Sequence, residues 1–151
     1  MDVRNNITGA ELEQRFRDIY EQRMQGLPFV NTRLEVEAIG FRSFHEFEIG
    51  VLITPWFMNL ILLPEAGAGT AIDQGHKINA QFASGDIEFT AARDEELGLF
   101  FSAVLFSSVS AIPDQEKARD LADEVMARLF KREQKTFRRR ALFLGSEQAD
   151  A

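Results

Sequence analysis

Hydrophobic residues recur along this chain with two different periods, and these periods predict where helices and strands lie. Between residues 9 and 25, apolar side chains repeat at the helical spacing of about 3.6 residues, and Thr8 and Glu11 have the spacing of a capping box. Gly26 is well placed to end this helix. A second helical repeat runs over residues 113–130, with a proline suited to its first turn. We therefore predict one amphipathic helix near each end of the chain.

Between these helices, apolar and polar residues alternate in short runs, as they do in strands with one buried face. The runs cover residues 34–38, 47–53, 57–63, 78–82, 87–91 and 97–106. Two of them, 57–63 and 97–106, are apolar on both faces, so we expect the latter in the centre of a sheet or beneath a helix. Turns separate the runs, and no strand–helix–strand order occurs. The sequence predicts an α+β fold, with an antiparallel sheet of five or six strands flanked by an N-terminal and a C-terminal helix.

An uncharged stretch of fifteen residues, 50–64, includes the only tryptophan of the chain. It is shorter than the roughly 20 apolar residues that a membrane helix needs, and Pro55 would interrupt a continuous helix. We interpret it as two strands separated by a kink. Trp56 either packs beneath the terminal helices or joins Phe57 and Met58 in an exposed apolar patch that binds a protein. A further alternative is that the kink exposes strand edges to an added strand.

Composition narrows the class of protein. A chain of 151 residues that is 45% hydrophobic is large enough for a single domain with its own core, and most of its fourteen phenylalanines must lie there. The absence of cysteine excludes disulfides, iron–sulfur clusters, thiolate zinc sites and a cysteine nucleophile. The first thirty residues lack the apolar segment of a secretory signal. We therefore expect a cytoplasmic protein that is not an integral membrane protein.

Charge is distributed unevenly along the chain. The net charge is −7, but residues 1–130 have a net charge of −10 and residues 131–151 have one of +3. An acidic body repels phosphate backbones, so we expect no nucleic acid as a partner, and a basic peptide suits it better; alternatively, the acidic surface only keeps the protein soluble. In the basic tail, Arg138, Arg139 and Arg140 precede the apolar residues 141–144. This tail either binds an anionic surface or folds back over the acidic body.

The usual catalytic patterns are missing. The glycines of residues 65–75 form neither a dinucleotide-binding nor a phosphate-binding motif. His45 and His76 have no second close histidine and no suitably spaced carboxylate pair, and the serines at 107–110 are typical of turns and helix caps. We therefore predict no catalytic residues, no cofactor-binding residues and no metal site, and a protein that is not an enzyme.

Two motifs give the chain a resemblance to a known family. One is ITPWFM at residues 53–58, and the other is RRALFLG at residues 139–145, some eighty residues later. Over residues 8–145 the chain resembles the HybE family, which includes HupJ-type proteins and consists of assembly chaperones of nickel-iron hydrogenases. The resemblance implies a single HybE-like domain over residues 1–145, and we expect a disordered tail at residues 146–151.

The resemblance also implies partners. Members of this family are thought to bind immature hydrogenase subunits, either the precursor of the large subunit or the small subunit with its twin-arginine signal, before export. Some relatives include a rubredoxin module or act beside a rubredoxin, so a rubredoxin-type accessory protein is a further implied partner. The signature positions become the candidates for partner binding: Thr54, Pro55, Trp56, Phe57, Met58, Arg139 and Arg140.

Two other interpretations stay open at this point. The chain could be a small-molecule-binding or enzymatic α+β domain that uses the concave face of its sheet, with the 65–75 loop as a lid. It could also be a structural subunit that remains in the mature hydrogenase. Saturable binding of a metabolite would favour the first alternative, and stoichiometric recovery with the active enzyme would favour the second.

Overall fold

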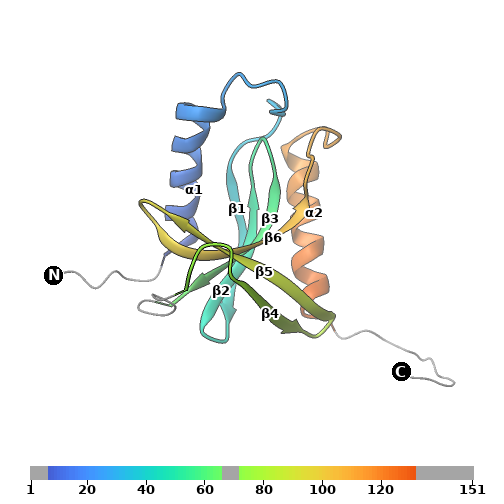
Figure 1. The fold of residues 1–151 in the computed structure, drawn as a ribbon. Helices are drawn as coiled ribbons and strands as arrows, with labels where there is room; N and C mark the ends of the chain where they lie inside the picture. The colour runs from blue at the N-terminus through green and yellow to red at the C-terminus, as the bar shows by residue number, and fades with distance from the viewer. Residues whose placement is uncertain (1–6, 66–71, 132–151) are drawn as a thin grey trace, which may run out of the picture.

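The computed structural model describes residues 7–65 and 72–131. In chain order the elements are α1 (Gly9–Ile19), a short π-helix η1 (Tyr20–Met24) that continues α1, β1 (Glu37–Phe44), β2 (Phe47–Ile53), β3 (Met58–Pro64), β4 (Lys77–Phe82), β5 (Gly85–Asp94), β6 (Gly98–Phe106) and α2 (Gln115–Leu129). The strands form one sheet in the order β1-β2-β3-β6-β5-β4, and every neighbouring pair is antiparallel. The predicted α+β architecture, with a helix near each end, is confirmed, and the sheet has six strands (Figure 1).

The two helices cover different faces of the sheet, and β2 shows why. Val51 and Ile53 are buried in the hydrophobic cluster that includes α2, whereas Leu52 is buried in the cluster that includes Leu12 of α1. Successive residues of a strand point to opposite faces, so a strand that is apolar on both faces fits a sheet that is covered on both sides. β3 and β6 have the same character and lie side by side in the middle of the sheet, as expected for residues 97–106.

The sheet curls so that one end of β1 approaches one end of β4. β1 and β4 are the outermost strands, yet the rings of Phe44 on β1 and Phe82 on β4 stack with their centroids 4.6 Å apart. The ring of Phe130, which directly follows α2, lies 5.9 Å from that of Phe44 and 6.0 Å from that of Phe82. Aromatic packing at the end of α2 therefore joins strands that share no hydrogen-bond ladder.

Local capping fixes the ends of the helices. Thr8 Oγ1 accepts a hydrogen bond from the Glu11 amide at 3.1 Å, and Glu11 Oε1 accepts one from the Thr8 amide at 3.0 Å, which forms the predicted capping box. Gly26, with φ +89°, follows the last helical turn as expected. The second helix begins directly after its cap residue, Asp114. Pro113 therefore lies just before the helix, not in its first turn.

The prediction of a strand at residues 34–38 is wrong for most of that segment. Leu34 and Val36 are buried in opposite hydrophobic clusters, which produces the alternation, but residues 34–36 pair with no strand. The observed strand, β1, begins at Glu37. Its own alternation is hidden by a bulge, since the register shifts between Ile39 and Arg42 around a glycine with positive φ.

A glycine in β2 makes room for an aromatic ring. A Cβ atom added to Gly50 would lie 2.3 Å from Cδ1 of Phe41, closer than side chains approach. Gly50→Ala should therefore lower the free energy of unfolding by about 1–3 kcal/mol, because the ring has to move out of a packed layer. Urea denaturation measures this. Gly9→Ala is the matched control: its Cβ would meet the same ring at 3.4 Å, and alanine favours the helix. Equal stability of the two variants would contradict this packing.

Candidate functional site

The predicted kink between two strands is a tight turn at residues 54–57, locked from inside by one side chain. Thr54 Oγ1 accepts hydrogen bonds from the amides of Trp56 at 3.1 Å and Phe57 at 2.9 Å, and it donates to the Phe57 carbonyl at 3.1 Å. The Thr54 amide donates to the same carbonyl at 2.9 Å. The sequence Thr-Pro-Trp-Phe therefore forms a fixed turn, because a single hydroxyl satisfies three of its backbone groups.

Four of the five described signature residues form this turn and the fifth, Met58, begins β3, but they differ in exposure. Thr54 and Met58 are fully buried, and Pro55 is buried as well. Trp56 and Phe57 are half-buried, so these two side chains reach the surface. In the folded chain, Thr54, Pro55 and Met58 support the site from beneath, and Trp56 and Phe57 are available for contact.

Arg139 and Arg140 lie outside the described residues. The alternative in which the kink exposes strand edges is wrong, because β2 and β3 each pair with a strand on both sides.

Trp56 belongs to an aromatic cluster that includes α1. Its ring stacks on Tyr20 with a centroid distance of 6.2 Å and an angle of 13° between the ring planes. Phe57 meets it edge-on at 5.5 Å, and Phe16 lies 6.4 Å away. The ring packs against the N-terminal helix, as the first interpretation of Trp56 predicted, and still keeps part of its surface exposed. The second interpretation is wrong for Met58, which is fully buried and cannot join an exposed patch, and protein binding by Trp56 and Phe57 stays a prediction.

Asn31 connects this turn to two other loops. Its backbone amide donates to the Pro55 carbonyl at 2.8 Å. Its side-chain Nδ2 donates to the carbonyls of Val109 and Ile112, both at 3.0 Å. Its Oδ1 accepts a hydrogen bond from the Arg33 amide at 3.0 Å. We call the three loops joined in this way, residues 25–36, 54–57 and 107–114, the loop end; they lie together at the top of Figure 1.

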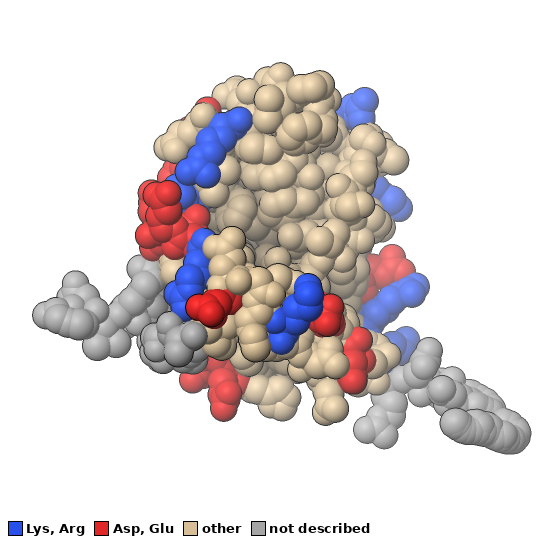
Figure 2. Space-filling view, viewed as in Figure 1, with Lys and Arg blue, Asp and Glu red and all other residues tan. Residues whose placement is uncertain are grey.

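The large hydrophobic side chains that stay exposed gather at this end. Among the described residues they are Leu27, Phe29 and Val104, which are 38%, 58% and 64% exposed. Leu27 and Phe29 belong to the loop end, and Val104 pairs with Asn59, two residues beyond the Thr54 turn. The upper part of the molecule in Figure 2, where the loops lie, is mostly uncharged, and charged side chains gather along the sides and below.

A shallow cavity of about 390 Å³ opens between two loops of this end. Its lining residues are Pro28, Phe29, Val30, Asn31, Thr32, Arg33, Ser108 and Ser110. The sequence patterns did not identify Phe29 or Asn31 as part of a site, because both lie in a segment with turn chemistry. An aromatic residue inside such a turn, in Leu-Pro-Phe at residues 27–29, is the signal that was available.

One buried polar atom beside the loop end has no hydrogen-bond partner among the described residues, namely Oδ1 of Asn59. Asn59→Leu should therefore raise the free energy of unfolding by about 1 kcal/mol, because it removes a desolvated acceptor. Thr54→Val is the matched control and should lower stability by about 1–3 kcal/mol, because two amides lose their acceptor. Urea denaturation measures both changes. A loss of stability in Asn59→Leu would show that Oδ1 has a partner in solution.

In the described ranges, no three His, Cys, Asp or Glu side chains come together in a group that could hold a metal ion. No helix in the same ranges is long and apolar enough to cross a membrane. Most of the proposed lid, residues 66–71 of the 65–75 loop, lies outside the described residues.

Comparison with known proteins gives a consistent set of similarities. A family model described as NiFe-hydrogenase assembly chaperone HybE matches residues 8–145. Probable rubredoxin HupJ of Rhodobacter capsulatus is 42% identical over 119 residues, which cover 78% of this chain and 43% of that protein. Hydrogenase expression/formation protein HupJ of Bradyrhizobium diazoefficiens is 38% identical over 121 residues, covering 80% and 70%. The chain thus spans less than half the length of the first relative and most of the second.

The fold has a counterpart among solved structures. The solution structure of HybE from Escherichia coli aligns with a TM-score of 0.63 and 21% sequence identity, over 95% of this chain and 96% of that one. At that identity the similarity concerns the fold.

Proposed function

Because the chain belongs to the HybE family of NiFe-hydrogenase assembly chaperones, we propose that it binds an immature hydrogenase subunit in the cytoplasm and holds it until assembly can proceed. The client is the precursor of the large subunit, or the small subunit with its twin-arginine signal, and binding precedes export. The family that the two sequence motifs indicated is confirmed. The choice of client, the timing and the compartment belong to the proposal.

The observation that supports this proposal best is the position of the exposed hydrophobic side chains. Leu27 and Phe29 lie on one loop, and Trp56 on the neighbouring turn is tied to that loop through Asn31. Aromatic side chains fixed on a rigid support are the usual anchors of protein interfaces. An incompletely assembled subunit still exposes apolar surface, so it offers complementary chemistry. A small apolar contact area surrounded by polar residues also favours rapid release of the client.

Charge supports a basic client segment. The net charge of residues 1–130 is −10, although Lys and Arg side chains lie among the acidic ones along the sides of the molecule in Figure 2. An acidic surface beside an apolar one attracts a partner that combines arginine with hydrophobic residues, and it raises the rate of encounter more than the final affinity. A twin-arginine signal has this composition.

A rubredoxin-type accessory protein is a second proposed partner. The Rhodobacter capsulatus relative has the name probable rubredoxin, and the aligned region covers less than half of that protein. This chain has no cysteine, so an iron–thiolate centre would have to come from such a partner.

Co-purification tests the proposed function. The tagged chain, isolated from cells arrested before nickel insertion, should retain the precursor of one hydrogenase subunit. Phe29→Asp should lose that precursor, and Phe29→Leu, the matched control, should keep it, because only the first change places a charge in an apolar contact. Recovery of the mature, active enzyme instead would identify a structural subunit. Stabilisation by a small metabolite, with no precursor retained, would identify a ligand-binding domain. Either result would overturn the proposal.

A further inference from the structure

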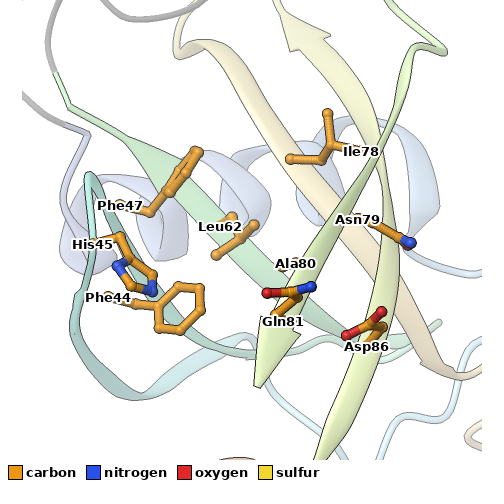
Figure 3. A pocket seen from close by; sticks show the side chains of 9 residues that line it. All are labelled: Phe44, His45, Phe47, Leu62, Ile78, Asn79, Ala80, Gln81 and Asp86. Carbon is orange, nitrogen blue, oxygen red and sulfur yellow. The ribbon is translucent and has the colours of Figure 1, made fainter. Parts of the chain in front are cut away.

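A groove of about 360 Å³ lies at the opposite end of β2 and β3 from the loop end. Figure 3 shows the tip of the β1–β2 hairpin, with Phe44, His45 and Phe47, on one side of it and β4 on the other. Leu62 and Ile78 give the groove an apolar interior. Its remaining lining residues are Asn79, Ala80, Gln81 and Asp86, so polar groups and one carboxylate form its rim.

The two edges of the sheet differ in how helix side chains contact them. Along β1, Glu13 of α1 accepts a hydrogen bond from the Ala38 backbone amide at 2.8 Å, and Arg119 of α2 forms an ion pair with the Glu37 side chain at 2.8 Å. β4 pairs with β5 alone, and among the described residues no helix side chain bonds to its free edge. An uncovered edge strand beside an apolar groove is suited to take up an extended segment.

We propose that the groove binds residues 139–144 of this same chain, Arg-Arg-Ala-Leu-Phe-Leu, as an extended segment along β4. The first reason is position. α2 ends at Leu129, and the ring of the next residue, Phe130, contacts Phe44 and Phe82 at the end of the groove. The chain therefore leaves the described region beside the proposed site.

The second reason is length. Eight residues, 131–138, separate Phe130 from the proposed segment, and they span up to about 26–29 Å when extended. The six residues of β4 cover roughly 20 Å. The connection is thus long enough to place the segment anywhere along β4.

The third reason is complementary chemistry. The segment combines two arginines with four apolar residues, and the groove combines an apolar interior with Asp86 on its rim and Glu88 exposed on the adjacent strand. The charges of +3 for residues 131–151 and −10 for the rest add a long-range attraction. Because the segment is part of the same molecule, it acts at a high effective concentration, and modest contacts are sufficient.

The absence of cysteine in the chain allows a direct test. Ser146→Cys introduces a single attachment point for a nitroxide spin label, just beyond the proposed segment. In the full-length, isotope-labelled protein, the label should remove the amide signals of residues 78–81 and 44–47. The signals of the loop end, such as that of Phe29, should be retained. Reversing the charges of the segment with Arg139→Glu and Arg140→Glu should restore the lost signals, and this change leaves the folded body untouched.

Three results would overturn the inference. Retention of the groove signals in the labelled protein would show that the segment does not lie there, as expected if only a client peptide enters the groove. Loss of the signals when spin label and isotope are on different molecules would identify a second copy as the occupant. Loss that persists after the charge reversal would show that the arginines have no part in binding. This test involves no hydrogenase subunit, so its failure and a failure of the proposed function are distinguishable.

Discussion

Asp94→Ala should lower the free energy of unfolding by about 3–5 kcal/mol, the loss expected when one partner of a buried ion pair is removed. The Arg15 side chain on α1 is 5% exposed, and its Nε donates to both carboxylate oxygens of Asp94, at 3.0 and 2.9 Å. Asp94 also accepts hydrogen bonds from the backbone amides of Glu96 and Leu97, at 2.9 and 3.0 Å. The substitution therefore leaves a buried guanidinium with one exposed partner and loosens the β5–β6 turn on which α1 rests.

The same carboxylate should make stability depend on pH. Burial alone would raise the pKa of Asp94, but hydrogen bonds from the Leu97 and Glu96 amides and from Arg15 outweigh it, so the pKa lies below its ordinary value. A lowered pKa in the folded chain gives a stabilisation that is complete above the unfolded-state pKa of about 3.9 and is lost as pH falls through the folded-state value. Stability should thus decrease more steeply below about pH 4 in the wild type than in Asp94→Asn.

Glu96→Ala is the matched control for this ion pair. Glu96 contacts the same arginine at 3.2 Å but is 65% exposed, so its removal should change stability by less than about 1 kcal/mol. Urea denaturation followed by circular dichroism at pH 7 compares the variants. If Asp94→Ala lowered the free energy of unfolding as little as Glu96→Ala does, the ion pair would not hold α1 on the sheet.

Trp56→Ala should weaken binding of a hydrogenase precursor by about 2 kcal/mol, roughly thirty-fold in Kd, which is the size of effect found at aromatic interface anchors. It should also lower stability by about 1–3 kcal/mol. That loss is smaller than for a fully buried aromatic residue, because Trp56 is half-buried against Tyr20 and Phe57. The two effects are measured separately, by titration with purified precursor and by denaturation.

A core variant separates binding from stability in this prediction. Phe89 on β5 is fully buried and lies in the cluster beneath α2, so Phe89→Leu should cost a similar stability without touching the loop end. Both variants are compared at a temperature at which each is folded. If Phe89→Leu weakened precursor binding as much as Trp56→Ala, the loss would reflect stability and not a contact at Trp56.

Much of the fold could be predicted because its determinants are local. Thr8 and Glu11 are close enough in sequence to form their capping box within one turn. Pro55 prevents a continuous helix, and the apolar runs before and after it are long enough for two strands. Apolar residues on both faces of 97–106 indicated a central strand, and β6 lies between β3 and β5.

The features that escaped prediction depend on contacts between distant parts of the chain. The sequence pattern predicts a solvent-exposed helix residue at Arg15, but its partner Asp94 is 79 positions away. It predicts a turn residue at Asn31, but the partners of Asn31, Val109 and Ile112, lie about eighty positions further along. The exposure of Phe29 cannot be read from hydrophobicity, since the same residue type fills the core.

The candidate site could be predicted only in part, for the same reason. The ITPWFM motif indicated the turn at residues 54–57, but it could not show which of its side chains face outward. Thr54 and Met58 are buried, whereas Trp56 and Phe57 reach the surface. The neighbouring loop at residues 27–33 joins the candidate site only through the hydrogen bond from the Asn31 backbone amide to the Pro55 carbonyl, which no sequence pattern signals.

The most direct test of a chaperone that binds its client through the loop end is calorimetric titration of the full-length chain with purified precursors of the large and the small hydrogenase subunit. We predict saturable binding to one of these precursors, with an affinity that decreases in Trp56→Ala and in Phe29→Asp but not in Phe29→Leu. Absence of binding to both precursors, or equal binding by all of these variants, would contradict this account.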